Sequence, residues 1–492
     1  MKQASKFEKI AARCWNLLNE GKPFTPIFVI GTILIFQIPS LLNGSFWIHF
    51  LLALAISIPL IALFFIFDFP LMLRNYLWIP LFAYLLLFNG INLPLLLFAV
   101  GLYFFFTVFF WGTFYYHLRI GTAWTNFTRF WKLVLKNSDS TSGNAQEQMP
   151  KFLLLLSVWN YFFTAFENGR ELNLSNYLIL TGFYIGLFLY SYILHRYLFD
   201  WKPSEYKELT TEQHPNQPAE LSKKVIVIVI DGMRMDRFQE AQTPFLDSLR
   251  KGGTEFTKME TVYPARTVVC FSSMFTGTYP REHGITSNMV WKLGIKVESI
   301  FDSLRKVGKK GRLLGIAHLV DSMGTDVETV TAVMNNDLAD RNIMERSKKI
   351  MKEQNPDLLI TQLISTDQTG HSRGALYEEY KEKIEEADKL IEEYVDWLTE
   401  NGMMDNTTLL ICADHGQADG IGGHGHLDEG ERFVPFFLHG PSIESGQIIQ
   451  TKHSLVSVAP TIAYLLGAPY PNKSRGHVLL EAMKGKQKEK AV

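Results

Sequence analysis

The chain has 492 residues, enough for about two to four domains at roughly 100–200 residues each, and its charges are unevenly spread. Residues 1–200 contain 13 Lys and Arg and 8 Asp and Glu, whereas residues 201–492 contain 35 and 41, so an apolar first part precedes an ordinary globular one. This composition excludes a fully soluble protein, a disordered chain and a disulfide scaffold, while the net charge of −1 and the three scattered cysteines argue against general nucleic-acid binding and a Cys-type zinc site.

The first 200 residues contain six apolar runs that predict a multi-pass transmembrane domain of five or six spans. No cleavable signal peptide is evident before them. Since a bilayer core needs about 20 helical residues, the 16-residue run at 151–166 is the doubtful span. A buried core helix would explain any single run, but not so many within 200 residues. The predicted spans lie at about 25–43, 45–67, 75–90, 91–114, 151–166 and 176–197.

The distribution of Lys and Arg predicts the topology of these spans. The basic N-terminal arm and the basic loop at 118–150 are expected in the cytoplasm, with four spans between them. If the runs at 151–166 and 176–197 both cross the membrane, the C-terminal domain faces the cytoplasm, which is the side that charge counting favours. If the run at 151–166 does not cross, that domain lies outside. Residues 122–136 mix aromatic and basic side chains, which is typical of an interfacial amphipathic helix and equally of an ordinary loop helix. We therefore expect an integral, multi-pass cell membrane protein with a cytoplasmic N-terminus.

A polar segment at 201–222 with three prolines predicts a linker, 223–480 a catalytic domain and 481–492 a polar tail. The run VIVIVI before Asp231 is typical of a fully buried strand, as in parallel sheets. Strand-like and helix-like patterns then alternate, which predicts an α/β domain with a mostly parallel central sheet and helices on both faces. Ligands of such sheets lie beyond the carboxyl ends of the strands.

Polar clusters follow the predicted strands at several points. Asp231 ends the first strand, TDQTGH at 366–371 follows DLLITQLIS, Asp414-His415 follow TTLLIC, and GGHGH at 422–426 precedes FVPFF. One Asp after a strand is usually a helix cap, and one His is usually structural. Three carboxylates and several histidines at one sheet edge would repel and resist ionisation without cations. They therefore predict two divalent metal ions, zinc or manganese, which these nitrogen and oxygen ligands suit.

Residues 223–480 resemble the alkaline phosphatase superfamily, in particular its type I phosphodiesterase/nucleotide pyrophosphatase branch. The similar stretches occur in the family's order and cover about half of the chain, whereas the apolar part lies outside the resemblance. The resemblance implies an alkaline-phosphatase-like fold and a metal-dependent phosphoric ester hydrolase of the phosphodiesterase type. The stretches are VIVIDGMR, VYPARTVVCFSSMFTGTYPREHGITSN, NPDLLITQLISTDQTGH, LLICADHG, GGHGHLDEGERFVPFFLHGP and SVAPTIAYLLGAPYP.

The resemblance also implies roles for individual residues. Thr267, after VYPAR, corresponds to the nucleophile, which would form a phosphothreonine intermediate. The last histidine ligand is ambiguous between His424 and His426; His424 is preferred because its G-x-H-G setting is similar to that of membrane phosphoethanolamine transferases. By resemblance, one metal takes Asp367, His371 and His424, and the other takes Asp231, Asp414, His415 and the Thr267 oxygen.

The motif departs from the family at Cys270. The phosphodiesterase branch usually has Asn three residues after the nucleophile, where it contacts a phosphoryl oxygen, and a thiol donates only weakly. The departure puts a nucleotide substrate in doubt. Cys270 is interpreted either as a reactive thiol or as a small buried helix residue.

Four functions compete for this sequence. The first is a membrane-anchored, two-metal phosphodiesterase or phosphohydrolase whose substrate is a membrane-proximal or lipid-linked phosphoester. The second is a transferase of a phospho-headgroup such as phosphoethanolamine, which would use the same residues. A cofactor-independent mutase is disfavoured because such enzymes lack membrane spans and use Ser. A non-catalytic membrane protein with a relict domain is disfavoured because every ligand position is filled. Membrane lipids are expected as partners, and nucleic acid is not.

Overall fold

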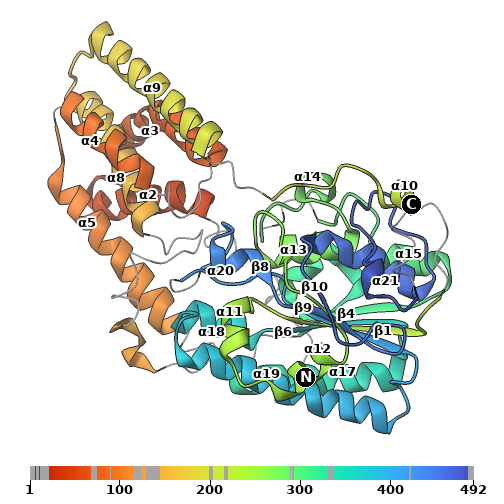
Figure 1. Ribbon diagram of the computed structural model, residues 1–492. Helices are drawn as coiled ribbons and strands as arrows, with labels where there is room; N and C mark the ends of the chain where they lie inside the picture. Colours follow the sequence, from red (N-terminus) through yellow and green to blue (C-terminus); the bar gives the residue numbers. More distant parts are fainter. Residues whose placement is uncertain are drawn as a thin grey trace. The chain divides into compact units, whose positions relative to one another are not determined.

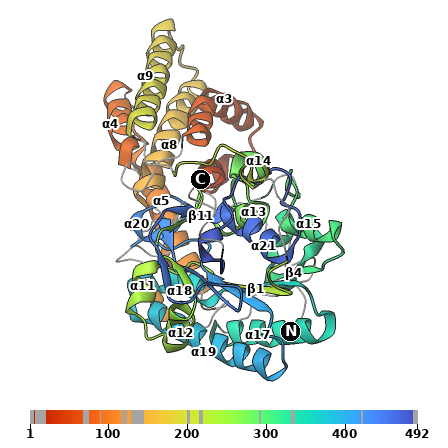
Figure 2. The same ribbon diagram turned by 45° about the vertical axis from the view of Figure 1, so that its right-hand side comes forward.

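The computed structural model divides into two compact units, which are described separately. The N-terminal unit comprises Leu17–Tyr115 and Trp124–Lys202, and the C-terminal unit contains the chain from Pro203 onward (Figures 1 and 2). The structure describes residues 6, 10, 21–67, 75–88, 90–115, 117, 123–128, 145–198, 203–214, 220–288, 290, 293–330, 336–419 and 423–485. Most of the predicted basic N-terminal arm, the basic part of the 118–150 loop, most of the predicted 122–136 helix and the tail beyond 485 lie outside the described residues.

Apolar helices make up the described part of the N-terminal unit, and four of these described helices are long and apolar enough to cross a membrane by length and composition: α3, the run of α5 into η3, α8 and α9. Two shorter apolar helices, α2 and α4, accompany them. This set fits a membrane protein. The helices are α2 (Gly21–Phe36), α3 (Gly44–Ile66), α4 (Trp78–Leu87), α5 (Leu93–Phe104), which continues as the π-helix η3 (Phe105–Tyr115), α8 (Ala145–Glu167) and α9 (Leu174–Leu198).

Helix α8 is longer than the apolar run at 151–166 suggests, because it begins six residues earlier and spans 23 residues. Its polar first turns are buried with partners: Glu147 pairs with Lys151 one turn later, and Gln148 accepts a hydrogen bond from Thr25 on α2 (2.7 Å). Pairing lowers the cost of burying such groups. Of the residues in the apolar 18-residue stretch of α8, 67% are buried, whereas in the corresponding stretch of α9 the share is 17%. Helix α8 is therefore the central helix of the unit.

An eight-stranded sheet forms the centre of the C-terminal unit, in the order β10-β2-β9-β7-β1-β6-β4-β5. Strand β1 lies parallel between β6 and β7, and β9 runs antiparallel to both β2 and β7. The prediction of an α/β domain with a mostly parallel sheet is confirmed. The strands are β1 (Lys224–Ile230), β2 (Thr254–Phe256), β4 (Gly311–Ile316), β5 (Val327–Val330), β6 (Leu358–Leu363), β7 (Thr407–Cys412), β9 (Phe436–His439) and β10 (Gln447–Ile449). A small second sheet joins β3 (Met259–Glu260), β8 (Phe433–Val434) and β11 (His453–Ser454).

Helices cover both faces of the large sheet, as Figures 1 and 2 show. One face carries α11 (Met235–Glu240), α12 (Pro244–Lys251), α17 (Asn336–Gln354), α18 (Ser365–Arg373) and α19 (Glu378–Glu400); the other carries α13 (Thr267–Thr276), α15 (Ile300–Lys306) and α21 (Val458–Leu466). Residues 225–230 of β1 are buried throughout, which explains the uninterrupted β-branched run. Short helices complete the unit: α10 (Thr210–Gln213), α14 (Pro280–His283), α16 (Val320–Met323) and α20 (Glu429–Arg432).

The predicted linker at 201–222 has described residues that pack on the C-terminal unit. Thr210 Oγ1 donates a hydrogen bond to Gly476 O (2.7 Å), and the Tyr206 amide donates to the Tyr279 hydroxyl (3.0 Å). The last predicted strand, FVPFFLHG, is divided at Pro435 into β8 and β9, which belong to different sheets. Proline removes a backbone donor from the ladder, which accounts for the break.

Candidate metal centre and nucleophile

The candidate site lies where β1, β6 and β7 end. Asp231 directly follows β1, Asp367 lies in the first turn of α18 after β6, and Asp414 and His415 follow β7. The parallel register sets Ile230 opposite Leu363 and Val229 opposite Cys412, so the three strands end at the same edge. Side chains far apart in the sequence therefore meet there.

Asp231, Asp414 and His415 form the first group, called here the Asp231 triad. One ligand atom from each lies within 4.8 Å of the others, and all three side chains are buried. His415 Nε2 lies 3.5 Å from Asp231 Oδ1 and 3.4 Å from Asp414 Oδ2. These two oxygens accept no hydrogen bond from the described part of the chain. The other oxygens are occupied, by Gln362 Nε2 (2.6 Å) and the Gly232 amide (3.1 Å), so each carboxylate offers one oxygen to the triad.

Asp367, His371 and His424 form the second group, the Asp367 triad, which also has ligand atoms within 4.8 Å of one another. His371 Nε2 lies 3.3 Å from Asp367 Oδ2 and 3.1 Å from His424 Nε2. Gln417 Nε2 donates to Asp367 Oδ1 (2.6 Å). The two triads adjoin, because the His415 and His424 rings stack with centroids 3.9 Å apart.

Backbone carbonyls set the orientation of two of the histidines. His415 Nδ1 lies 2.9 Å from Gly416 O, and His424 Nδ1 lies 2.8 Å from Ala265 O. Because a carbonyl oxygen only accepts, we assign the proton to Nδ1 in both rings, which leaves each Nε2 with a free lone pair facing its triad. Metal-ligating histidines commonly have this outer hydrogen bond.

The buried charges also fit cations. Burial, with added repulsion from Asp414 and Asp367, raises the pKa of Asp231 well above its ordinary value, and burial also raises the pKa of Asp414. Burial opposes ionisation of Asp367 too, but His371 beside it holds its pKa below the ordinary range. Burial and the neighbouring His415 lower the pKa of His424, so that ring is neutral. Neutral imidazoles and crowded carboxylates suit a divalent ion in each triad.

Thr267 is the first residue of α13 and is only 4% exposed. Its Oγ1 lies 3.2 Å from His415 Nε2, which places the hydroxyl beside the Asp231 triad. The neighbouring Val268 amide donates to Asn288 Oδ1 (3.0 Å), so the loop after α14 orders the start of the helix. The structure thus brings together all seven residues that the resemblance implies.

Cys270 and His426 belong to neither triad. Cys270 is fully buried one turn into α13, with Sγ 3.4 Å from Thr261 Oγ1, and burial raises the pKa of its thiol well above the ordinary value. A neutral, buried thiol is a poor nucleophile, which favours the interpretation as a packing residue. His426 is fully buried and belongs to neither triad in the described part of the chain.

Comparisons with known proteins agree with this geometry. The family model "Type I phosphodiesterase / nucleotide pyrophosphatase" matches residues 225–303, and the model "Sulfatase" matches residues 327–468. The C-terminal unit belongs to the alkaline phosphatase superfamily. Both matched segments contain residues of the site: Asp231 and Thr267 lie in the first, and the remaining members of the triads lie in the second.

Curated relatives of this superfamily domain include both transferases and phosphodiesterases. Human GPI ethanolamine phosphate transferase 2, catalytic subunit, is 25% identical over 55% of this chain and 29% of its own length. Human GPI ethanolamine phosphate transferase 3, catalytic subunit, is 32% identical over 30% of this chain and 13% of its own. Mouse ectonucleotide pyrophosphatase/phosphodiesterase family member 7 is 24% identical over 40% of this chain and 51% of its own length. The chain therefore spans about half or less of these three relatives.

Solved structures similar to this chain include murine ectonucleotide pyrophosphatase/phosphodiesterase 5, with a TM-score of 0.43 and 14% identity, covering 50% of this chain and 96% of that one. Wild-type alkaline phosphatase PafA has a TM-score of 0.46 and 11% identity, and the match covers 54% of this chain and 99% of that one.

Sequence reasoning missed the residues that support the candidate metal ligands. Gln362 and Gln417 each donate to one carboxylate of the site. Glu431 is fully buried, and its Oε2 accepts the amides of Gly425, His426 and Leu427 at 2.7, 2.8 and 3.0 Å. A signal existed for Gln362, a polar residue inside the buried strand LLITQL. None existed for Glu431, which lies in a charged stretch like an ordinary surface turn.

Glu431→Gln is expected to weaken metal binding by about 10–100-fold, a range typical of residues that orient metal ligands. A neutral amide accepts the three backbone hydrogen bonds less strongly than a carboxylate, so the segment that carries His424 loses its fixed position. The measurement is a competition titration with a chelating dye on the full-length protein. Glu429→Gln, on the exposed side of the same helix α20, is the matched control and should bind as the unchanged protein does. Equal affinities for the two variants would refute the positioning role.

His283 gives a pH-dependent stability to the loop that follows α13. Its Nδ1 accepts the Ile285 amide (3.1 Å), so its Nε2 carries the proton that reaches Ser273 Oγ (2.9 Å), and burial lowers its pKa to about 3. Because the folded pKa lies below the unfolded value, the stability contribution is complete above pH 6.5 and is lost as pH falls towards 3, by up to about 5 kcal/mol. His283→Gln should reduce the fall in unfolding temperature that the unchanged protein shows between pH 7 and pH 4. His439→Gln, at a half-buried site, is the control and should leave most of this pH dependence of the unfolding temperature. An unchanged slope in His283→Gln would contradict this assignment.

Proposed function

We propose that the C-terminal unit is a metal-dependent phosphodiesterase that acts on a membrane-proximal or lipid-linked phosphodiester through a covalent intermediate on Thr267. The observation that carries this proposal is the position of the Thr267 hydroxyl. It lies at the start of α13, 3.2 Å from His415 Nε2 and beside two triads suited to divalent cations. A hydroxyl next to two cation sites at one sheet edge is suited to in-line attack on phosphorus.

The Asp231 triad with Thr267 would hold one divalent ion and the Asp367 triad the other, with zinc or manganese suiting the ligand set. When bound, such ions neutralise phosphoryl oxygens and make hydroxyl groups more acidic. The protein keeps these ligands ready through fixed outer contacts. The Gly416 and Ala265 carbonyls orient two imidazoles, while Gln362 and Gln417 orient two carboxylates.

The reaction proceeds in two displacements. Thr267 Oγ1 forms a bond to phosphorus as the bond to the leaving alcohol oxygen breaks; the Thr267 proton passes to solvent and the alcohol takes one up. Water then attacks phosphorus, the bond to Thr267 Oγ1 breaks, and the hydroxyl is restored.

A second candidate, transfer of a phospho-headgroup to an acceptor hydroxyl, is supported by the two relatives that are GPI ethanolamine phosphate transferases. The first displacement is the same, and an acceptor alcohol replaces water in the second. The apolar helices of the N-terminal unit suit a lipid-linked donor or acceptor under either candidate. A relict, non-catalytic domain is disfavoured because both triads are complete.

The test uses full-length protein in vesicles that contain phosphatidylethanolamine labelled in its headgroup, with and without zinc or manganese. A phosphodiesterase releases water-soluble labelled phosphoethanolamine, whereas a transferase moves the label to another lipid and releases little. Bis(p-nitrophenyl) phosphate is the soluble comparison substrate. Turnover of neither substrate with either metal would overturn the proposed function.

We further propose a multi-pass location with the N-terminus in the cytoplasm. Four helices are long enough to cross, and α2 and α4 are shorter, so the number of crossings fixes the side of the C-terminal unit. If all six cross, that unit faces the cytoplasm. A reporter enzyme fused after Val492 that is active only outside the cytoplasm would contradict six crossings.

A further inference from the structure

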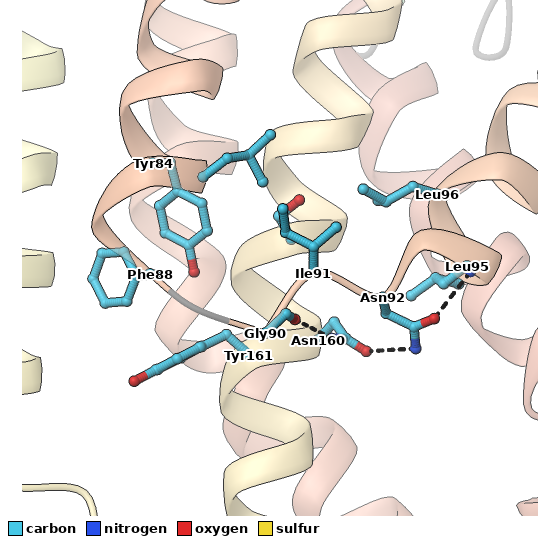
Figure 3. A pocket seen from close by; sticks show the side chains of 11 residues that line it. Tyr84, Phe88, Gly90, Ile91, Asn92, Leu95, Leu96, Asn160 and Tyr161 are labelled. Carbon is cyan, nitrogen blue, oxygen red and sulfur yellow. Dashed lines mark hydrogen bonds between the residues drawn. The ribbon is translucent and has the colours of Figure 1, made fainter.

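A cavity lies within the N-terminal unit, beside the turn that joins α4 to α5 (Figure 3). It measures about 280 Å³ including its open mouth. The lining residues are Tyr84, Leu85, Phe88, Gly90, Ile91, Asn92, Leu95, Leu96, Ser157, Asn160 and Tyr161.

The Tyr84 hydroxyl is the exceptional group of this cavity. Tyr84 is 2% exposed, and its hydroxyl has no hydrogen-bond partner among the described residues. It points into the space bounded by Phe88, Gly90 and Tyr161 (Figure 3). A buried hydroxyl without a partner is unfavourable, so this site is incomplete without a bound polar group.

Other polar groups line the same cavity. Asn92 Nδ2 donates to Asn160 Oδ1 (3.1 Å), and Asn92 Oδ1 accepts the Leu95 amide (3.1 Å), which fixes both amides. Asn160 Nδ2 makes one long contact, 3.5 Å to Gly90 O, and an amide nitrogen has two hydrogens to donate. Ser157 Oγ donates to Leu153 O (2.7 Å) and keeps acceptor capacity. Donors and acceptors are both present, as a hydroxyl ligand requires.

The rest of the lining is apolar and carries no charge. None of the eleven described residues that line the cavity is Asp, Glu, Lys, Arg or His, so a phosphate or an ammonium group would find no counter-charge there. Ile91, which follows α4, is 54% exposed, and Leu86, near the end of α4, is 86% exposed. Exposed apolar side chains next to the cavity suit a hydrocarbon chain. The turn between two apolar helices also suits the boundary between hydrocarbon and headgroups.

We propose that this cavity binds the free hydroxyl of a neutral lipid of the diacylglycerol type, with its acyl chains along the exposed apolar side chains beside the turn. The buried Tyr84 hydroxyl without a described partner calls for a polar group, and a lining without charged side chains disfavours a phosphorylated lipid. Long-chain alcohols have the same chemistry. This inference goes beyond the proposed function, because it does not depend on Thr267 or on metal binding.

The test measures thermal unfolding and equilibrium binding of full-length protein in detergent. Dioctanoylglycerol should bind saturably and raise the unfolding temperature by several degrees. Its acetylated form, which lacks the hydroxyl, and dioctanoyl phosphatidic acid, which is charged, should bind at least about tenfold more weakly. Dodecanol separates a general alcohol site from a diacylglycerol site: weaker binding of dodecanol supports the two-chain lipid, and equal binding overturns that part of the proposal.

Two tyrosine variants complete the test. Tyr84→Phe removes the partnerless hydroxyl; it should raise the unfolding temperature of the lipid-free protein and reduce affinity for dioctanoylglycerol by about 3–10-fold. Tyr184→Phe is the matched control in the same unit, since that hydroxyl already donates to Ile56 O (2.9 Å), and its affinity should not change. Equal affinity in the Tyr84→Phe variant, or the absence of saturable binding because water alone fills the cavity, would overturn the proposal. Either failure leaves phosphodiester turnover at Thr267 unaffected.

Discussion

Thr267→Ala is expected to reduce phosphodiester turnover by on the order of 10³–10⁶-fold, the range found when a covalent nucleophile is removed. The same variant should keep close to the full metal content, because six other ligands remain in the two triads. Turnover and elemental analysis of one purified sample separate these effects. Loss of metal together with activity would show that Thr267 acts mainly as a ligand.

Thr267→Ser should retain much of the activity, because a primary hydroxyl can occupy the same position beside His415. Thr399→Ala is the control: its hydroxyl donates to Val395 O near the end of α19, which leads into the start of β7, whereas the site lies beyond the end of that strand, so turnover should be unchanged. Acid-quenched samples of the unchanged enzyme should yield a phosphorylated or phosphodiester-linked peptide that contains residue 267. Near-full activity of Thr267→Ala would remove both the covalent mechanism and the transferase candidate.

The regular part of the C-terminal unit was predictable because its signals are local. The buried run before Asp231 identifies a central strand, and the amphipathic pattern of α19 identifies a long surface helix. Parallel strands with a common edge then bring Asp231, Asp367 and Asp414 together, so proximity follows from topology. Short strands such as β3 and β11, two residues each, carry no such signal and form only because tertiary contacts pair them.

The supporting contacts of the site could not be predicted in the same way. Whether His424 or His426 joins the Asp367 triad depends on how Glu431 gathers three successive amides, and that contact belongs to a loop without periodicity. The start of α8 was missed for a related reason. Glu147 falls in the predicted loop at 118–150, but its pairing with Lys151 allows both side chains to be buried in the helical unit.

Asp231→Asn is expected to change stability in opposite directions with and without metal. In chelator-treated protein, the change removes one of three neighbouring carboxylates, while Gln362 Nε2 can still donate to the new amide oxygen. We expect a gain of roughly 1–3 kcal/mol in the free energy of unfolding, the size typical of relieving an unfavourable buried charge. With zinc or manganese present, the variant should lose stability relative to the unchanged protein, because one ligand is missing.

The pH dependence of that gain has a definite sign. Burial, and then Asp414 and Asp367, raise the folded pKa of Asp231 above its unfolded value, so metal-free protein loses stability as pH rises from the unfolded pKa towards the folded one. Asparagine does not titrate, and the advantage of the variant should therefore grow with pH. Asp236→Asn is the matched control, because Asp236 is ion-paired with Arg234 (2.7 Å) and this pairing outweighs burial to lower its pKa, so the change should destabilise both forms. Thermal unfolding of the Asp231→Asn and Asp236→Asn variants, each with chelator and with added metal, checks these expectations. A loss of stability of equal size in both forms of Asp231→Asn would show that these carboxylates are not arranged around a cation.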